Sequence, residues 1–287
     1  VEYRKGFELD ENFKEIWERI KYKTTYRVNY KSSDLIDKAS NEIKKIPEIT
    51  KIVLKSTKTA IKYDDEGVGF DIKGSKKIYI ENEFLIPDVL NYIQNKTGLT
   101  RSSILQILKN SKRLNDVLIN PQLFMDYTIK EIQEVLNELI IKGIKYEKIG
   151  NKEYEMHLFE DDEINIYLDK LKFQVKNNNK TIYDNIIPLD SNVEYEFAKE
   201  CESRDDIEFY FKLPFWFHIK TPIGKYNPDW ALIKKNETKV YFVAETKSEP
   251  QQLRKSEEQR IQCGKAHFRE FDDVTFRGPI SKVSDLD

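Results

Sequence analysis

Cysteine, glycine and proline are all scarce in this chain, which has 2 Cys, 10 Gly and 9 Pro among 287 residues. Two cysteines, Cys201 and Cys263, are too few for a disulfide-stapled domain, and no CxxC pair indicates a zinc site. The low glycine and proline content excludes collagen-like and low-complexity chains. A cytoplasmic location, where thiols stay reduced, fits this composition best.

Long apolar segments are absent as well. No run of apolar residues approaches the roughly 20 that a membrane-spanning helix needs, so we expect no membrane partner. The N-terminal segment VEYRKGFELD lacks the apolar stretch of a signal peptide. Because the sequence begins with Val1 rather than methionine, we expect it to be a fragment of a longer protein.

Charged and aromatic side chains are abundant, at 34% and 12% of the residues. That aromatic content is typical of a chain that buries a core. The formal net charge is −2, but residues 1–150 hold 27 Lys and Arg against 23 Asp and Glu (+4), and residues 151–287 hold 21 against 27 (−6). A DNA-binding face would therefore have to be local.

The first part of the chain, residues 1–175, is predicted to mix helices and strands. Apolar residues at helical spacing predict a helix over 11–22, and Ser33 is placed to cap a second over 34–46. Strands are expected over 51–63 and 77–80, with the intervening DDEGVGF as a loop.

A helical module is expected over 86–158, with Pro87 in the first turn of its first helix. Its pattern predicts three helices (88–98, 101–111 and 129–144) followed by two short strands (145–149 and 153–158). Gly98 should end the first helix, Thr100 should cap the second, and Gly150-Asn151 is a hairpin turn signal. This order is winged-helix-like. Its basic stretch, with Arg101, Lys109, Lys112 and Arg113, has phosphate contact and a solvated helix surface as alternative roles.

The polar sequence NNNK at 177–180 marks the expected boundary to a second domain, residues 180–287. Its pattern predicts a helix over 192–201 capped by Ser191, strands over 207–216, 229–234 and 239–247, and a polar helix over 251–267. The expected fold class is α+β or α/β, with a mixed sheet flanked by helices.

Two of these strands would bring carboxylates together. If they form a hairpin symmetric about Glu237, paired residue numbers sum to 474, and Asp229 lies opposite Glu245. Opposed side chains share a face with Cβ atoms about 5 Å apart, and Lys247 points to the same face. Two such carboxylates repel one another unless a cation lies between them, and Mg²⁺ prefers these oxygen ligands. The alternative is a solvent-exposed strand end where Glu245 pairs with Lys247.

These residues also resemble a known family. The order P-D, 15 intervening residues and E-T-K resembles the PD-(D/E)xK nuclease motif. The wider text, TPIGKYNPDWA with FVAETK, resembles the endonuclease domain of the restriction subunits of type III restriction enzymes, over about residues 183–270. Upstream text such as TGLTRSSILQILKN is similar to the region that follows the helicase motor in these subunits.

The resemblance implies Mg²⁺-dependent cleavage of double-stranded DNA in the cytoplasm of a prokaryote. It implies that Asp229, Glu245 and Lys247 are catalytic, that Asp229 and Glu245 bind the metal, and that the Thr246 carbonyl is a third ligand. Glu194 matches a further metal-site acid.

On the same helix as Glu194, Glu196 and Glu200 remain alternatives for that acid. The DNA-contact candidates are Lys225 and Tyr226, which precede Asp229, together with Arg254 and Arg260 on the last helix. Surface roles unrelated to DNA remain the alternative for the two arginines.

One feature of the family is missing. There is no GxxxxGK[ST] motif in the 287 residues, so ATP is expected for the full-length enzyme and not for this fragment. In the whole enzyme, the family implies coupling to an ATP-driven motor and to a methyltransferase subunit that reads the site. The alternative function is a non-catalytic module that positions DNA and binds the motor or the methyltransferase.

Overall fold

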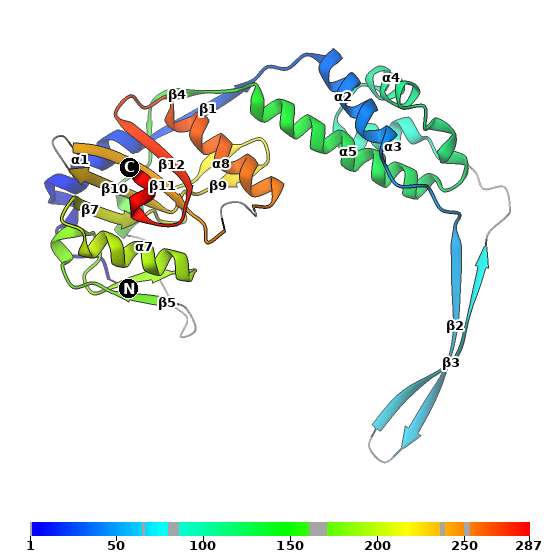
Figure 1. Ribbon diagram of the computed structural model, residues 1–287, viewed down its shortest axis with the longest axis horizontal. Coiled ribbons are helices and arrows are strands. Elements are labelled where there is room, and N and C mark those ends of the chain that lie inside the picture. The colour runs from blue at the N-terminus through cyan, green and yellow to red at the C-terminus, as the bar shows by residue number, and fades with distance from the viewer. Residues whose placement is uncertain (1, 65–66, 80–85, 161–170, 236–238, 250–252) are drawn as a thin grey trace. The chain divides into compact units, whose positions relative to one another are not determined.

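The computed structural model describes residues 2–64, 67–79, 86–160, 171–235, 239–249 and 253–287. The chain forms two compact units (Figure 1). One, here the sheet unit, joins Val1–Asn29 to Ile140–Asp287, and the other, the helical unit, is Tyr30–Leu139. The structure thus divides the chain at positions other than the predicted 175/180 boundary. The predicted class, a mixed fold of helices and sheets, is confirmed.

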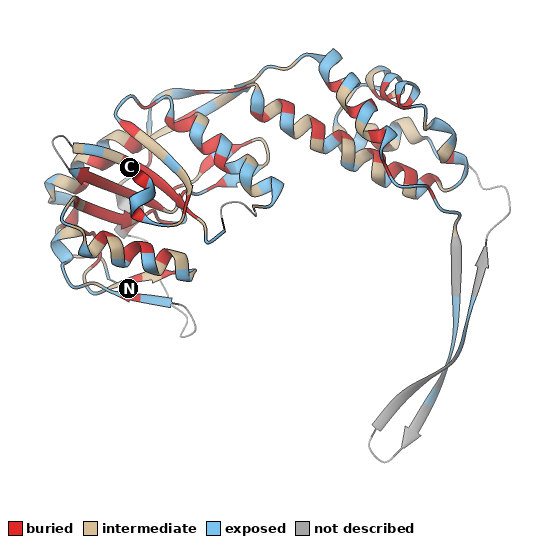
Figure 2. Ribbon diagram, in the orientation of Figure 1, coloured by how far each residue is buried: buried red, intermediate tan, exposed pale blue. Residues whose placement is uncertain are grey.

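The sheet unit is built around four strands in the order β12-β11-β10-β7. They are β7 (Ile207–Lys212), β10 (Trp230–Lys235), β11 (Lys239–Thr246) and β12 (Val274–Ile280). Strands β7, β10 and β11 pair antiparallel, while β12 lies parallel to β11. Figure 2 shows that buried residues concentrate in β7, β10 and β11, as expected for strands covered on both faces.

The predicted hairpin register is confirmed. Trp230 pairs with Ala244 and Lys235 with Lys239, so each pair sums to 474. Residues Trp230, Ala231, Leu232 and Ile233 of β10 are completely buried. Because consecutive residues are buried on both faces of β10, the register is set by the short connection to β11 and not by a polar face.

Helices and small sheets complete the unit. They are α1 (Glu11–Ile20), α6 (His157–Glu160), α7 (Asn192–Ser203) and α8 (Lys255–Phe268), with the sheets β1 (Tyr22–Val28) with β4 (Ile144–Glu153), β5 (Leu171–Gln174) with β6 (Ile186–Leu189), and β8 (Ile219–Thr221) with β9 (Gly224–Tyr226). The predicted Ser191 cap of α7 is confirmed, since its hydroxyl accepts from Glu194 N at 3.3 Å. The strand predicted over 207–216 ends at Lys212, and the turn-rich TPIGKYNP contributes to the β8–β9 hairpin.

The N-terminal 29 residues belong to this unit because their apolar face is buried in its core. Phe13 and Trp17 of α1 join the same core cluster as Phe211 and Phe217. Asp10 caps α1 by accepting from two backbone N–H groups. On β1, the Thr24 hydroxyl lies 2.8 Å from Nδ1 of His267 on α8. The Thr24–His267 contact spans 243 positions, beyond the reach of local pattern.

The winged-helix-like prediction is wrong at its wing. Residues 144–153 form one strand, β4, which continues through Gly150 (φ 48°) and pairs antiparallel with β1. Gly150-Asn151 is therefore not a hairpin turn, because β4 is stabilised by pairing with a distant strand. Residues 157–160 form the short helix α6 rather than a strand.

The helical unit contains α2 (Ser32–Lys44), α3 (Val89–Thr97), α4 (Arg101–Ser111) and most of α5 (Pro121–Lys142). Two of its predicted helix ends are confirmed: Gly98 ends α3 with φ 71°, and Thr100 caps α4 by accepting from Ser103 N at 3.2 Å. Asp88 caps α3, so Pro87 precedes the helix. Helix α5 begins at Pro121, earlier than predicted.

A long antiparallel hairpin, β2 (Val53–Asp64) with β3 (Gly67–Tyr79), extends from this unit. The DDEGVGF sequence, predicted as a loop, lies partly in strands, since Gly67–Phe70 belongs to β3. Residues 65–66 of this predicted loop, and residue 80 of the strand predicted over 77–80, lie outside the described residues. Helix α2 begins at Ser32 with Lys31 at the cap, so Ser33 lies in the first turn rather than capping it.

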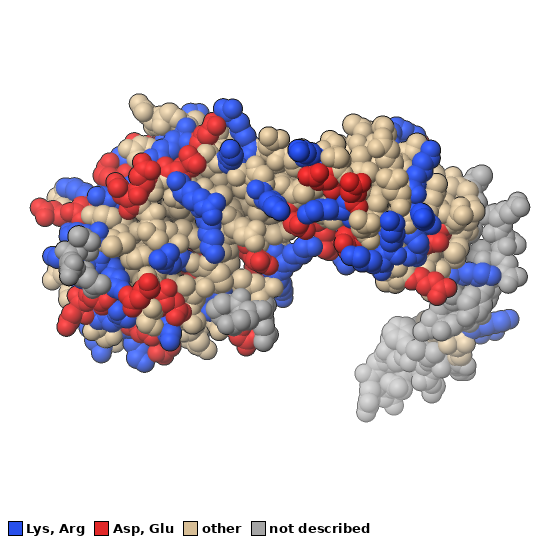
Figure 3. Space-filling model, turned by 45° about the horizontal axis from the view of Figure 1, so that its top comes forward, with Lys and Arg blue, Asp and Glu red and all other residues tan. Residues whose placement is uncertain are grey.

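Two of the four basic residues in and just after α4 make contacts within the helical unit. Arg101 pairs with Asp88 at 3.2 Å, and Arg113 donates to the Ile46 carbonyl at 2.9 Å. Lys109 and Lys112 are exposed. On the face visible in Figure 3, basic and acidic side chains are interspersed.

The described residues include no helix with the length and apolarity needed to cross a membrane.

Acid should destabilise the sheet unit through His267. Burial lowers the pKa of this imidazole to about 3, from its ordinary value of 6.5. Between these values the unfolded chain binds the extra proton, so stability is complete above pH 6.5 and falls as pH decreases. From pH 6.5 to pH 5, we expect a loss of about 2 kcal/mol from this group. Urea unfolding of wild type and His267→Gln should show a shallower pH dependence in the variant; equal dependences would contradict this.

Candidate active site

Asp229 is held at the junction of three strands. It directly precedes β10, its N–H donates to the Ala244 carbonyl at 3.1 Å, and its carbonyl accepts from Leu213 N at 2.8 Å. Thr246 donates to Oδ2 with its N–H at 2.7 Å and its hydroxyl at 2.8 Å. Within the described part of the chain, Oδ1 receives no hydrogen bond, which leaves this oxygen for a ligand.

Glu245 lies one residue before Thr246 on β11 and is 5% exposed. Its Oε2 accepts from the Tyr226 hydroxyl at 2.8 Å, and its Oε1 is 3.2 Å from Lys247 Nζ. Burial first, and then the charge of Asp229, raises the pKa of Glu245 to about 8. The two predicted partners are therefore electrostatically coupled, as the hairpin register requires.

Because Gly278 has no side chain, β12 can pack closely against Glu245. A Cβ atom at this glycine would lie 2.7 Å from Glu245 Cβ, closer than carbon atoms approach without a shift. The register between β11 and β12 also shifts between Ala244 and Thr246. A missing side chain on β12 thus makes room for the carboxylate at the end of β11.

Lys247 is partly exposed and is anchored by its own N–H, which donates to the Ile280 carbonyl at 2.8 Å. Burial lowers the pKa of its ammonium, but the charges of Glu245 and Asp229 outweigh this, so the pKa is raised. Lys247 is therefore a cation beside both carboxylates. Its pairing with Glu245 matches the alternative considered from the sequence, but Glu245 is buried instead of solvated.

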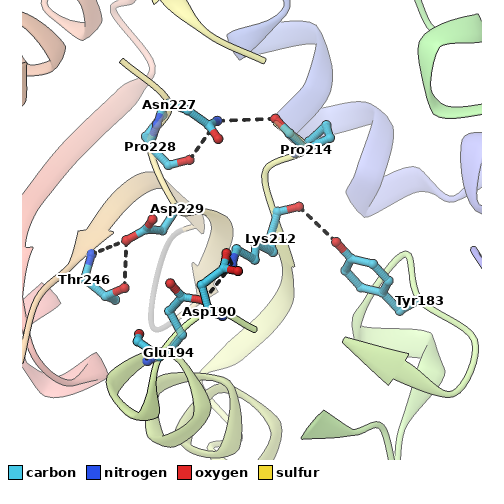
Figure 4. Close-up of polar contacts among 10 residues, drawn as sticks. Tyr183, Asp190, Glu194, Lys212, Pro214, Asn227, Pro228, Asp229 and Thr246 are labelled. Carbon is cyan, nitrogen blue, oxygen red and sulfur yellow. Dashed lines mark hydrogen bonds and ion pairs between the residues drawn. The ribbon is translucent and has the colours of Figure 1, made fainter. Parts of the chain in front are cut away.

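Glu194 is the acid of α7 that faces this site. It is 7% exposed, and its Oε2 accepts from Lys212 Nζ at 2.6 Å and from Asp190 N at 3.0 Å. The alternatives serve other contacts, because Glu196 pairs with Lys199 and Glu200 accepts from Val283 N. Figure 4 shows Glu194 and Asp190 meeting Lys212, with Asp229 bound to Thr246 beside them.

The negative charge of Glu194 affects the ionisation of Asp229. Burial first, and then the charge of Glu194, raises the pKa of Asp229 to about 6. The Thr246 hydrogen bonds and Lys212 act in the opposite direction. Glu194 thus interacts electrostatically with Asp229, and Asp229 with Glu245.

Lys212 was not predicted. It ends β7, and its ammonium lies 2.7 Å from Asp190 and 2.6 Å from Glu194. Its backbone carbonyl accepts from the Tyr183 hydroxyl at 3.2 Å. The only sequence signal was a lysine at the end of the apolar strand IEFYFK, which is too common to assign a role.

Tyr226 is buried, whereas a DNA contact requires an exposed side chain. It was expected to contact DNA, but it is 4% exposed and its hydroxyl donates to Glu245. Its ring packs so close to Gly264 of α8 that a Cβ there would overlap with Tyr226 Cε1. Tyr226 therefore positions Glu245. The other three DNA-contact candidates, Lys225, Arg254 and Arg260, are exposed, and their role stays a prediction.

The charge balance and donor chemistry of the site fit a divalent cation. Two lysines, Lys212 and Lys247, accompany four carboxylates, Asp190, Glu194, Asp229 and Glu245, which leaves two negative charges when all are ionised. No group of three or more His, Cys, Asp or Glu in the described ranges could hold a metal ion by itself. An ion held by one or two carboxylates and completed by water is the arrangement typical of Mg²⁺.

Residues 179–283 match a family model described as an endonuclease domain. This range contains α7, the strands β7, β10 and β11, α8 and β12, and so holds Asp229, Glu245 and Lys247. No curated protein and no solved structure matches the chain. The comparison therefore supports an endonuclease domain, similar to those of restriction enzymes, over this part of the sheet unit.

Proposed function

We propose that this chain is the nuclease part of a type III restriction enzyme, and that it hydrolyses phosphodiester bonds of double-stranded DNA in a Mg²⁺-dependent reaction. The observation that supports this most strongly is the coupling of Asp229 with Glu245, beside Lys247, inside the range that matches an endonuclease domain. A buried glutamate and a half-buried aspartate that repel one another lower the stability of a fold unless a cation lies between them.

In this proposal, each side chain has a distinct task. Asp229 and Glu245 bind the ion, and the Thr246 carbonyl is a further ligand. The ion would supply Lewis-acid stabilisation of the attacked phosphate and activation of water. Lys247 neutralises charge on the phosphate and assists the attacking water.

The surrounding groups position these residues. Thr246 fixes one oxygen of Asp229 through two hydrogen bonds, which orients the other. Tyr226 fixes Oε2 of Glu245. Lys212 holds Glu194, which orients a water beside the ion or contributes to a second ion. Lys225, Arg254 and Arg260 contact the DNA backbone.

The larger assembly also belongs to the proposal. An ATP-driven motor elsewhere in the full-length protein would control cleavage, and a methyltransferase subunit would choose the site. The chain itself would act in the cytoplasm of a prokaryote.

Conversion of supercoiled plasmid by the purified chain tests the nuclease proposal. With Mg²⁺ or Mn²⁺ we expect nicked and linear products, and none with EDTA. Binding of duplex DNA without any cleavage in either metal would instead support the non-catalytic coupling module. A chain that neither binds nor cuts DNA would contradict both.

Tyr226→Phe should lower the cleavage rate roughly tenfold and stability by about 1 kcal/mol, because Oε2 of Glu245 loses its donor while the ring still fills its place. The measurement is cleavage rate beside urea unfolding. Tyr241→Phe is a matched control, since that hydroxyl also donates to a glutamate, Glu15 of α1, at 2.9 Å, and Tyr241 lies on β11 four residues before Glu245. Equal activity losses in both variants would contradict a positioning role.

A further inference from the structure

A second feature of the sheet unit lies apart from the carboxylate site. A cavity of about 480 Å³ is lined by residues outside the candidate active site, among them Lys23, Lys152, Tyr154, Trp216, His218 and Lys220. They come from β1, from β4 and the segment after it, and from the chain entering β8. The volume is in the range of small-molecule sites.

The lining is basic. Among the described residues that line it are three lysines and a histidine but no Asp or Glu. Lys225 adds to this charge, because it pairs with Lys220 across the β8–β9 hairpin and paired side chains share a face. Burial first, and then the charges of Lys225 and Lys220, lowers the pKa of His218, which shows that the positive field extends into the cavity wall. Such a field favours an anion.

The walls are aromatic and are held in place. The rings of Tyr154 and Trp216 lie 6.3 Å apart with a 43° tilt, and Lys23 Nζ is 5.2 Å from the Tyr154 ring centroid. The Tyr154 hydroxyl donates to the His218 carbonyl. Ile149 and Leu158 add apolar surface. The cavity therefore offers flat apolar walls next to ammonium groups.

We propose that this cavity binds a nucleotide, with the phosphate at Lys152 and Lys220 and the base against Tyr154 and Trp216. An inorganic anion would use the lysines but not the aromatic walls, and a neutral apolar ligand would use the walls but not the lysines. A nucleotide uses both, since base–aromatic stacking contributes about 1–3 kcal/mol and lysine is a common phosphate ligand. Its source is a free mononucleotide or an unpaired nucleotide of a DNA strand.

Calorimetric titration in EDTA tests the proposal without involving the metal site, so a failed nuclease would not affect the result. The probes are thymidine 5′-monophosphate, deoxyadenosine 5′-monophosphate, thymidine, inorganic phosphate and a 5′-phosphorylated single-stranded tetranucleotide. We expect the two mononucleotides to bind at least tenfold more tightly than either thymidine or inorganic phosphate. A tighter tetranucleotide would indicate a DNA strand as the source, and equal affinity a free nucleotide.

Charge removal provides the matched variants. Lys152→Gln with Lys220→Gln should weaken nucleotide binding at least tenfold, while Lys172→Gln, an exposed lysine on β5, should leave it unchanged. All three lysines are exposed, so the variants should fold. Trp216→Leu should reduce the preference for nucleotide over inorganic phosphate. Equal affinity for phosphate and nucleotide, no nucleotide binding by wild type, or an unchanged double variant would overturn the proposal.

Discussion

Asp229→Asn should lower Mg²⁺-dependent DNA cleavage by roughly three orders of magnitude, which corresponds to about 4 kcal/mol of lost transition-state stabilisation. The amide keeps the size of the side chain and an oxygen for the Thr246 donors, so the fold should persist. It removes the negative charge from the oxygen that has no donor in the described part of the chain. The measurement is the rate of plasmid nicking at saturating metal.

Asp205→Asn is the matched control for this variant. Asp205 is an exposed carboxylate in the same unit, between α7 and β7, and its loss should leave the rate unchanged. Circular dichroism and urea unfolding would show that both variants fold. Cleavage by Asp229→Asn within tenfold of wild type would contradict a metal role for this residue.

The second large effect is expected from Gly278→Ala, a substitution that changes no polar group. The new methyl group would meet Glu245 Cβ at 2.7 Å, so either β12 or the Glu245 backbone must shift. Overpacking of this kind costs about 1–3 kcal/mol of stability. Because a displacement of about 1 Å at a catalytic group can cost roughly 100-fold in rate, we expect cleavage to fall by 10- to 100-fold.

Gly74→Ala separates this effect from a general cost of replacing glycine. An added Cβ at Gly74 meets no atom within 4 Å, and this glycine lies in β3 of the other unit. Cleavage and unfolding midpoint should both stay near wild type in that variant. A Gly278→Ala protein as active and as stable as Gly74→Ala would show that Glu245 does not depend on the close approach of β12.

The sequence pattern predicted those parts of the fold that depend on residues close together in the chain. The β10–β11 register followed from the short connection between the two strands, taken as a hairpin symmetric about Glu237, so Asp229 and Glu245 could be paired before any coordinates were considered. The helix ends at Gly98 and Ser191 followed from the backbone groups that these residues free or satisfy. In both cases the information lies within a few residues.

The assignment of Glu194 could have been sharper. The buried face of α7 is Glu194, Phe197, Ala198 and Cys201, a spacing of three, four and seven residues. This places Glu194 on the apolar stripe, whereas Glu196 and Glu200 fall off it. A carboxylate within a buried stripe is unusual enough to have selected it among the three acids.

Other features depend on distant partners and could not be predicted. Strand β4 runs through Gly150 because β1 pairs with it from more than 100 residues away. Lys212 and Tyr226 acquire their roles only when β7 and β9 are placed beside α7 and β11. Nothing in the neighbouring sequence distinguishes this lysine from a solvated one, or this tyrosine from a surface contact.

Calorimetric titration of the whole chain with Mn²⁺ tests the central claim most directly, since it asks whether Asp229 and Glu245 hold an ion together. The titration would be run alone and with a duplex that carries phosphorothioate linkages at every phosphate. We predict binding by wild type and by Asp205→Asn, and loss of binding in both Asp229→Asn and Glu245→Gln. Binding that survives both substitutions, or no binding by wild type with or without the duplex, would contradict the account.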